Sequence, residues 1–358
     1  MAIDFGALFG RKNPPMIGLD ISSSGIKLVE LVESGRNELR LECYASEPLP
    51  RGAVVDGNIE NIDQVSDAIA RAWKKSGTRA KLAAMGMPPA SVITKKIILP
   101  SHLSEEGLEL QVETEASQYI PFALDEVRLD FDVIGPLESS PDDMEVMLAA
   151  TRKEKVEDRV AVAEAAGLKP TVMDIESYAA RAAINRVVRQ KKTDGQILGL
   201  FQIGTNVTHM SILQDGQLIY EREQPFGGHQ LTQDIVRNYG FSYEEAEIKK
   251  RTGDLPEGYQ AEILEPFLEN AALEITRAIQ FFFTSTPYSR IDQLFLAGGC
   301  ANIPGLVEMI ANRTRISTSV VSPFAGMQLG PNVREKQLRA EAPAYLVACG
   351  LALRRFDQ

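Results

Sequence analysis

Residues 17–31, IGLDISSSGIKLVEL, decide the fold. Apolar residues alternate on both sides of a turn made of three serines and a glycine, which predicts two strands joined by a tight hairpin. The small hydroxyls and bare amides of such a turn can wrap an anion. Asp20 ends the first strand, where a carboxylate can hold a hydrated Mg²⁺. Lys27 begins the second strand, where its ammonium can reach the same phosphates. An ordinary hairpin with an acidic edge is the alternative.

Residues 199–213, GLFQIGTNVTHMSIL, repeat this pattern about half a chain length later. An apolar strand is followed by a polar residue, a Gly-Thr-Asn turn and a second apolar strand. Gln202 takes the place of Asp20. An internal repeat at this spacing predicts two similar lobes, whose hairpins would close on one ligand from both sides.

Composition excludes several classes of function. The 358 residues include 38 basic and 49 acidic side chains, for a net charge of −11. This balance argues against general nucleic-acid binding and against a polybasic membrane surface. The three cysteines form no CxxC, so we expect a reduced cytosolic chain without disulfides or zinc. The three histidines show no metal-binding spacing, and no segment approaches the roughly 20 apolar residues that a bilayer requires.

The first half of the chain is predicted to combine a sheet with a small inserted module. A third strand at 40–45 follows the hairpin. A helix comes next, between the N-cap Asn61 and the stop Gly77, and then a strand at 81–87. The following segment has the order β-α-β-β-α-β, which resembles a split-βαβ module. Its strands are expected at 91–99, 127–134, 146–150 and 171–175, with a turn at 139–143 and helices beginning at 104 and 153.

The second half begins after a polar hinge at 191–195. Before the hinge, residues 174–178 lead into a helix that is expected to run to about 190. Beyond the second hairpin we expect a strand at 217–223, a Gly-rich loop leading into a helix at 226–235, and helices at 243–251 and 259–283. A strand at 291–296 precedes a helix that starts at 303–305, and a closing helix spans 343–354. Residues 2–12 are compatible with a loose amphipathic lead segment, although a plain disordered leader is the preferred interpretation.

Taken in order, these motifs resemble the actin-like ATPase superfamily, which includes actin, Hsp70, sugar kinases and the division protein FtsA. Within it the chain resembles the PilM family of type IV pilus assembly proteins over nearly its whole length. The resemblance rests on the opening hairpin, on PFGGHQLT at 225–232 and on LFLAGGCANIPGL at 294–306. It implies an α/β, actin-like (RNase H-like) two-domain fold with a nucleotide cleft between the domains. The implied subdomains are 1A (1–87, 173–190, 340–358), the inserted 1C (88–172), 2A (195–225, 270–339) and the helical, adenosine-side 2B (226–269).

The resemblance also implies ATP and Mg²⁺ as ligands. Asp20 would place the metal through water. The residues that would contact phosphate are Ser22, Ser23, Ser24 and Lys27 on one side, and Gly204, Thr205 and Asn206 on the other. The residues that would lie near the nucleoside are Gly227, Gly228, Glu247, Lys250, Gly298, Gly299 and Asn302. Without the resemblance, Glu247 and Lys250 read as an exposed i, i+3 ion pair, and Gly298-Gly299 as a strand-to-helix turn.

One departure from the superfamily affects catalysis. Many actin-like ATPases have an aspartate where this chain has Gln202, and a neutral amide cannot share the charge of a metal. Glu176 is the nearest candidate for positioning an attacking water; its alternative role is that of a helix-start carboxylate that stabilises the dipole. We therefore expect ATP binding, with hydrolysis weak or absent.

The resemblance further implies a partner, the cytoplasmic N-terminal peptide of PilN, in a groove between the hairpin domain and the inserted domain. Other pilus platform proteins and the assembly motor ATPase would be further partners, and association with the inner membrane would be indirect. Two alternatives remain. One is an active kinase or ATPase of the same fold, which the small insert and Gln202 disfavour. The other is an FtsA-like membrane-tethered filament protein, which would need a terminal amphipathic tail after the closing helix.

Overall fold

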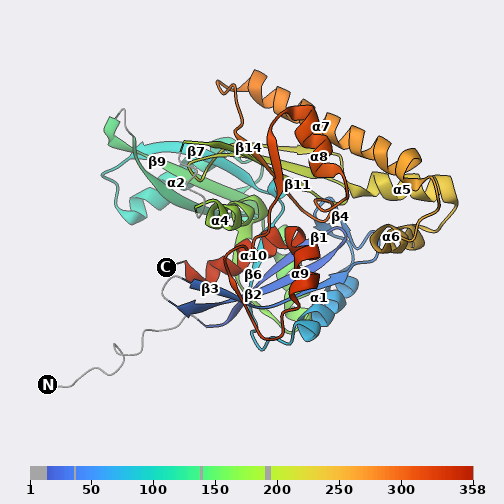
Figure 1. The fold of residues 1–358 in the computed structure, drawn as a ribbon. Helices are drawn as coiled ribbons and strands as arrows, with labels where there is room; N and C mark the ends of the chain where they lie inside the picture. Colours follow the sequence, from blue (N-terminus) through green and yellow to red (C-terminus); the bar gives the residue numbers. More distant parts are fainter. Residues whose placement is uncertain (1–13, 36–37, 138–139, 190–194, 358) are drawn as a thin grey trace.

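The computed structural model describes residues 14–35, 38–137, 140–189 and 195–357 (Figure 1). The lead segment at 2–12 and most of the hinge at 191–195 lie outside these residues. Two sheets form the body of the molecule, and a third, smaller sheet forms a module beside them. Among the described residues, no helix combines the length and apolarity needed to cross a bilayer.

The first lobe is built on a six-stranded sheet of order β10-β6-β1-β2-β3-β16. Its strands are β1 (Met16–Ser22), β2 (Gly25–Gly35), β3 (Glu38–Pro48), β6 (Leu82–Met87), β10 (Lys169–Ile175) and β16 (Gln328–Leu329). Helices α1 (Ile62–Ser76) and α3 (Lys153–Ala165) pack together with this sheet and share one apolar core. Helix α10 (Leu346–Leu353) packs on β1 so closely that a Cβ at Gly18 would lie 2.0 Å from the Ala348 carbonyl oxygen.

The second lobe is built on a five-stranded sheet of order β13-β12-β11-β14-β15. Its strands are β11 (Ile197–Ile203), β12 (Thr208–Gln214), β13 (Gln217–Gln224), β14 (Gln293–Ala297) and β15 (Ser317–Val320). A large core joins this sheet to α5 (Gly228–Tyr239), α6 (Tyr243–Thr252), α7 (Glu265–Ser285) and α8 (Leu306–Thr314). A π-helical turn, Gln260–Leu264, leads into α7.

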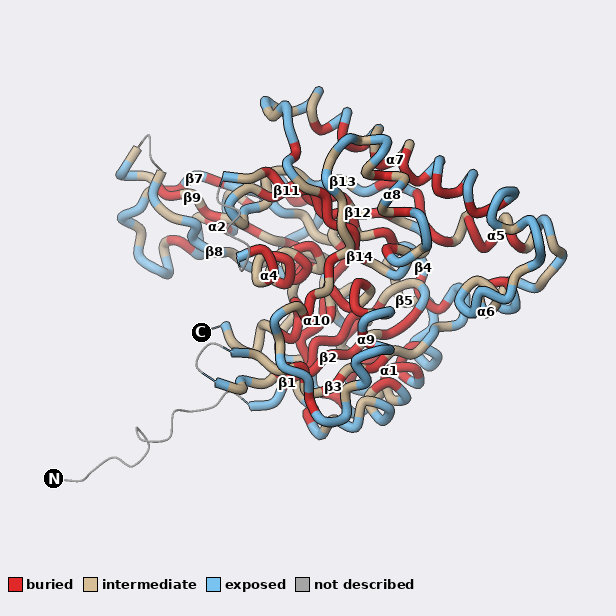
Figure 2. Tube along the Cα trace, viewed as in Figure 1, coloured by how far each residue is buried: buried red, intermediate tan, exposed pale blue. Residues whose placement is uncertain are grey.

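A shared core connects the two lobes. Helices α4 (Glu176–Arg189) and α10 contribute buried residues to a cluster that also contains Val29 and Leu31 of β2 and Leu198 and Leu200 of β11. Figure 2 shows this buried layer in the middle of the molecule. Because strands of both hairpins contribute to this core, the two sequence repeats lie on its two sides.

The small module has its own sheet of order β7-β9-β8 and its own core. It consists of β7 (Ile93–Pro100), α2 (Glu105–Tyr119), β8 (Val127–Leu137) and β9 (Ser140–Arg152). Two expectations were wrong here. The strand expected at 171–175 pairs in parallel with β6 in the large sheet, because Val162 and Ala163 of the preceding helix α3 are buried in the core of the first lobe. The turn expected at 139–143 is shorter, because β9 already begins at Ser140 and pairs with both neighbours.

Several boundaries follow from capping. Asn61 accepts a hydrogen bond from the Gln64 amide and Gly77 adopts a left-handed conformation, as predicted for α1. The helix expected from 303 begins at Leu306, because Gly305, at φ +84°, is its N-cap and Pro304 lies outside it. The sequence did not predict β4 (Val54–Val55), β5 (Asn58–Ile59), β15, β16, α9 (Glu335–Glu341) or the 3₁₀ turns Pro89–Ser91, Leu124–Glu126, Ala342–Tyr345 and Arg354–Phe356.

Candidate functional site

The first hairpin places a charged pair at its edge. Asp20 and Lys27 are cross-strand partners in the β1–β2 register. The Lys27 Nζ donates to Asp20 Oδ2 and to Ser22 Oγ, each at 3.2 Å. The Ser22 hydroxyl in turn donates to the Gly25 carbonyl at 2.8 Å. Asp20 is buried, whereas Ser24, in the turn, is exposed, so the hairpin presents hydroxyl and ammonium groups above a buried carboxylate.

The second hairpin has the same geometry with different chemistry. Gln202 and His209 are partners in the β11–β12 register. The His209 Nδ1 lies 3.0 Å from Glu223 Oε1 on β13. Burial alone would lower the pKa of His209, but the hydrogen bond and the charge of Glu223 outweigh it and raise that pKa. The turn between the strands is closed by a hydrogen bond from the Gly204 amide to the Val207 carbonyl at 3.0 Å.

The Gly-rich loop before α5 packs against this second turn. The Gly228 amide donates to the Gly204 carbonyl at 3.0 Å, and the His229 amide donates to the Thr205 carbonyl at 2.8 Å. A Cβ at Gly227 would lie 2.4 Å from the Thr205 carbonyl oxygen. The sequence predicted that Gly204, Thr205, Gly227 and Gly228 serve one site, and the structure brings them into direct contact. Asn206 lies exposed at the tip of the turn.

The loop after β14 reaches the same turn. Gly298 has φ +89°, and a Cβ there would lie 2.4 Å from the Ile203 carbonyl oxygen. Gly299 is exposed, and a Cβ there would have no heavy atom within 4 Å. Gly298 is therefore required by the packing of the loop, and Gly299 leaves open space that a ligand can approach. Asn302 is exposed and donates to the Ala340 carbonyl at 2.6 Å, at the end of α9.

Glu247 and Lys250 lie beside the Gly-rich loop rather than on an open helix face. The Lys250 Nζ lies 2.6 Å from Glu247 Oε1 and 2.6 Å from Thr232 Oγ1, and the Thr232 hydroxyl also donates to Glu247. Thr232 is buried on α5 and joins the pair to the helix that follows Gly228. This network fixes a cation and a carboxylate next to the loop.

Glu176 stands between the two hairpins. Burial raises its pKa to about 7, Arg159 opposes this shift and Asp20 adds to it, while His209 and Lys27 lower it. These groups come from both hairpins, so charges of both lobes act on the Glu176 carboxylate. Its side chain is 20% exposed, so the carboxylate is mostly buried but still reaches solvent. A Cβ at Gly86 would lie 2.7 Å from Glu176 Cγ, and this glycine therefore leaves room for the carboxylate.

The sequence did not identify Arg159, whose side chain is only 2% exposed. The Arg159 guanidinium donates to the Gly57 carbonyl at 2.9 Å and lies 3.9 Å from Glu176 Oε1, on its buried side. One of its terminal nitrogens, Nη1, has no hydrogen-bond partner among the described residues. It sits in a charged helix, a context that does not distinguish it from surface arginines. His209 was also missed, although its alignment with Lys27 in the repeat could have revealed it.

A further contact joins the lobes at the rim of the site. The Arg51 guanidinium, from the loop after β3, lies 5.1 Å above the ring of Tyr243 at the start of α6. The Tyr243 hydroxyl is 2.9 Å from His229 Nδ1, next to the Gly-rich loop. A cation–π contact therefore joins the first lobe to the second beside the Gly-rich loop.

The donor set limits how a metal could be held. Within the described part of the chain, no three His, Cys, Asp or Glu side chains are grouped so that they could hold a metal ion. A single buried carboxylate with hydroxyls beside it fits Mg²⁺, which keeps most of its waters and needs only one or two carboxylates. It does not fit a metal ligated directly by several side chains.

Comparisons with known proteins agree with this architecture. A solved structure described as the PilM-PilN type IV pilus biogenesis complex is 26% identical, with a TM-score of 0.81, and the match covers 97% of this chain and 100% of that one. The ethanolamine utilization protein EutJ of Carboxydothermus hydrogenoformans (17% identical, TM-score 0.56, covering 95% and 89%) and ADP-bound MreB5 of Spiroplasma citri (14%, 0.51, covering 97% and 100%) share the fold.

Among curated proteins, the cell division protein FtsA of Bacillus subtilis (strain 168) is 25% identical over 355 residues, which cover 87% of this chain and 80% of FtsA. The prediction of an actin-like fold is thus confirmed. The sequence model of the family of type IV pilus assembly protein PilM matches residues 18–356. Since this match spans almost the entire chain, the protein belongs to the PilM family of type IV pilus assembly proteins.

Proposed function

We propose that this protein is a scaffold of the type IV pilus machinery that binds ATP with Mg²⁺ between its lobes and binds the N-terminal cytoplasmic peptide of PilN between its first lobe and its small module. The observation that carries the nucleotide part is the packing of two glycine loops against the turn of the second hairpin, in a fold whose first hairpin presents Lys27 and serine hydroxyls beside the buried Asp20. Backbone amides and small side chains at such turns are suited to phosphate.

Each side of the site has its own role. Asp20 would hold the metal through water, while Lys27 and the hydroxyls of Ser22, Ser23 and Ser24 would contact the phosphates. Gly204, Thr205 and Asn206 would contact them from the second lobe. The nucleoside would lie along Gly227, Gly228, Gly298 and Gly299, near the Glu247–Lys250 pair. When bound, Mg²⁺ neutralises phosphate charge and links the phosphate oxygens.

Hydrolysis is expected to be slow. Gln202 supplies an amide where a carboxylate would share the charge of the metal. Burial raises the pKa of Glu176 to about 7, which leaves roughly half of it ionised at neutral pH and able to accept a proton, so the expectation of slow hydrolysis rests on Gln202. The nucleotide would then act mainly as a structural ligand or a switch that holds the lobes together.

The test is a calorimetric titration of MgATP into the full chain, after removal of any copurified nucleotide. We expect saturable binding that Asp20→Ala weakens strongly. Asp67→Ala, at an exposed position of α1, is the matched control and should bind as the original does. Absence of binding to the folded protein, or equal binding by both variants, would refute the nucleotide site.

The partner proposal rests on the family and on the similar solved structure, whose description names PilN. Phe122 and Leu124, which follow α2 in the small module, are 40% and 37% exposed. The Arg152 guanidinium lies 5.4 Å above the Phe122 ring, and Arg152 is the N-cap of α3, which packs on the first lobe. These apolar residues therefore lie where the module joins the first lobe, and they offer anchors for a short peptide.

This surface can be tested with a synthetic peptide of the PilN cytoplasmic N-terminus, by fluorescence anisotropy. Phe122→Ser with Leu124→Ser should reduce affinity at least tenfold. Ile248→Ser, at an apolar position of α6 that is 57% exposed, is the control and should bind normally. If the Phe122/Leu124 variant and the control bind equally, the peptide does not use this surface.

We place the protein in the cytoplasm, peripheral to the inner membrane through PilN, with other platform proteins and the motor ATPase as further partners. Liposome flotation tests this placement. The protein alone should stay with the unbound fraction and should float only when the liposomes carry the PilN peptide. Flotation without the peptide would instead favour direct tethering to the membrane.

A further inference from the structure

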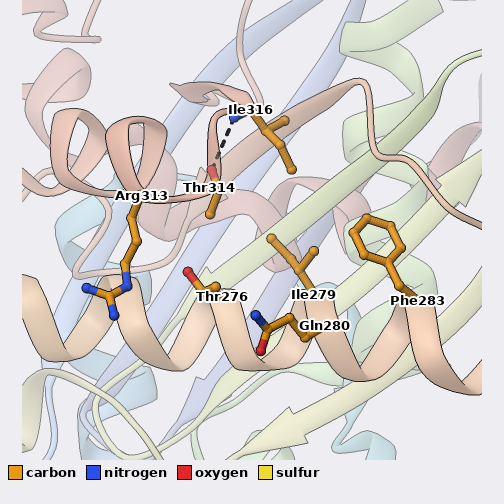
Figure 3. Close-up of a pocket in the computed structure, with 7 residues that line it drawn as sticks. All are labelled: Thr276, Ile279, Gln280, Phe283, Arg313, Thr314 and Ile316. Carbon is orange, nitrogen blue, oxygen red and sulfur yellow. Dashed lines mark hydrogen bonds between the residues drawn. The ribbon is translucent and has the colours of Figure 1, made fainter.

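Arg159 of α3 and Arg313 of α8 carry the same charge in opposite surroundings. In Figure 3 the Arg313 side chain extends from α8 toward α7, at a hollow of about 250 Å³ that Ile279 and Phe283 also line. Arg313 is exposed, so water and salt screen its charge. The Arg159 side chain is only 2% exposed. Because a guanidinium keeps its proton in proteins, Arg159 places a positive charge in an interior that screens it weakly.

The charge of Arg159 has no close counter-ion among the described residues. Its Nη2 donates to the Gly57 carbonyl at 2.9 Å, and Glu176 Oε1 lies 3.9 Å from the same nitrogen, which is beyond hydrogen-bond distance. Its Nη1 has no hydrogen-bond partner in the described part of the chain. Burial lowers the pKa of this guanidinium, while the charges of Glu176, Asp20 and Asp158 raise it. The positive charge therefore acts on both Glu176 and Asp20, although neither carboxylate is hydrogen-bonded to it.

A second cation acts on Asp20 from within the first hairpin. The Lys27 Nζ donates to Asp20 Oδ2 and to Ser22 Oγ, and the Lys27 side chain is 17% exposed. A flexible, partly exposed lysine can turn toward a ligand. Arg159 cannot turn in this way, because it is buried and bonded to the Gly57 carbonyl. The hairpin thus has a movable cation of its own and a fixed cation supplied by α3.

We propose that the fixed positive charge of Arg159 makes the nucleotide site prefer the triphosphate over the diphosphate. This inference rests on the proposed nucleotide site. A charge in a weakly screening interior attracts an anion in proportion to the charge of that anion, and MgATP carries one more negative charge than MgADP. Arg159 also offsets the repulsion between phosphate groups and the carboxylates of Asp20 and Glu176. It acts through its electric field, without touching the nucleotide, and so determines specificity rather than catalysis.

The test is calorimetric titration of MgADP and of MgATP into full chains that carry Glu176→Gln, so that no proton can be taken up at position 176 when the arginine is removed. Adding Arg159→Met should lower the affinity for MgATP about tenfold and that for MgADP about threefold. The preference for ATP then falls about threefold, whereas a purely structural disturbance weakens both nucleotides equally. Arg159→Gln is also neutral but keeps a donor for the Gly57 carbonyl, and it should show the same change even if Arg159→Met does not fold.

Two other arginines provide controls in the same Glu176→Gln chain. Arg313→Met makes the same change in net charge at an exposed position. Arg186→Met removes a partly buried guanidinium that donates to the Pro323 and Ala325 carbonyls, roughly 15 Å further along α4 than position 176. Both should leave the preference for ATP unchanged, although the Arg186 variant should be less stable.

Two results would overturn the inference, and they are distinguishable. An unchanged preference for ATP in the Arg159 variants, in chains that still bind both nucleotides, overturns the role of Arg159 and leaves the nucleotide site standing. If the original chain binds neither nucleotide, the proposed nucleotide site itself fails, and the inference fails with it.

Discussion

The two hairpins share a backbone but differ in charge. Asp20 faces Lys27 in one, and Gln202 faces His209 at the same register in the other. In the first hairpin the two side chains pair with each other. In the second, the histidine turns to Glu223 on the next strand. In the proposed nucleotide site, one lobe would therefore supply the charges for metal and phosphate, while the other supplies a backbone turn braced by two glycine loops.

Moving the carboxylate from one hairpin to the other would test this division most severely. Asp20→Asn makes the first hairpin resemble the second. It should lower the affinity for MgATP about 100-fold, or about 3 kcal/mol, because a charge-assisted contact is lost. Adding Gln202→Asp should not restore affinity, since His209, the counterpart of Lys27 in the second hairpin, already pairs with Glu223. Calorimetry on both variants and on Gln202→Asp alone measures this. Original affinity in the double variant would show that the hairpins are interchangeable.

Glu176, between the hairpins, should make stability depend on pH. Its pKa is raised to about 7, so the native state holds the proton more tightly than the unfolded chain does. Stability should therefore be highest when Glu176 is protonated and fall by about 2–3 kcal/mol as pH rises from about 4.5 to about 7. The raised pKa of His209 acts in the same direction, since its stabilisation is present at low pH and is lost as pH rises through that pKa.

Chemical denaturation at pH 5, 6, 7 and 8 measures this slope. Glu176→Gln cannot titrate and should flatten it, whatever its effect on absolute stability. Glu113→Gln, at an exposed position of α2, should leave the slope unchanged. A Glu176→Gln protein with the original slope would mean that the carboxylate is not held in a low-dielectric position.

The repeat was predictable because alternation and turn composition are local. The two hairpins, the cap at Asn61 and the stop at Gly77 all follow from neighbouring residues. The pairing of β10 with β6 could not be predicted from neighbouring residues, because it depends on the burial of α3 against α1. Arg159 was invisible for the same reason: nothing near it in the sequence says that its helix lies behind Glu176. The two hairpin turns can be predicted from sequence, but the buried side chains that support them cannot.

A pair of neighbouring glycines separates packing from ligand contact in the second lobe. Gly298→Ala forces a Cβ onto the Ile203 carbonyl and a left-handed backbone onto alanine, so it should cost about 2 kcal/mol of stability. Gly299→Ala meets no atom and should leave the melting temperature within about one degree, while still weakening nucleotide binding a few-fold. Thermal melts with and without MgATP distinguish the two effects. Equal melting of both variants would contradict the bracing role of Gly298.

The smallest expected effect concerns the contact that spans the two sides. Arg51 over the Tyr243 ring is exposed to solvent at the rim, and such cation–π contacts contribute about 0.5–1 kcal/mol. Arg51→Ala should therefore speed release of a fluorescent ATP analogue about two- to fivefold in stopped flow, whereas Arg79→Ala, at an exposed position with no part in the site, should not.

Tyr243→Phe keeps the ring under Arg51 but removes the hydroxyl bonded to His229. If the ring holds the lobes together, release from Tyr243→Phe should match the original rate. If release from Tyr243→Phe is as fast as from Arg51→Ala, the hydrogen bond between the Tyr243 hydroxyl and His229 matters more than the cation–π contact. Nucleotide release would then be slowed by a hydrogen bond within the second lobe, and not by the contact between the lobes.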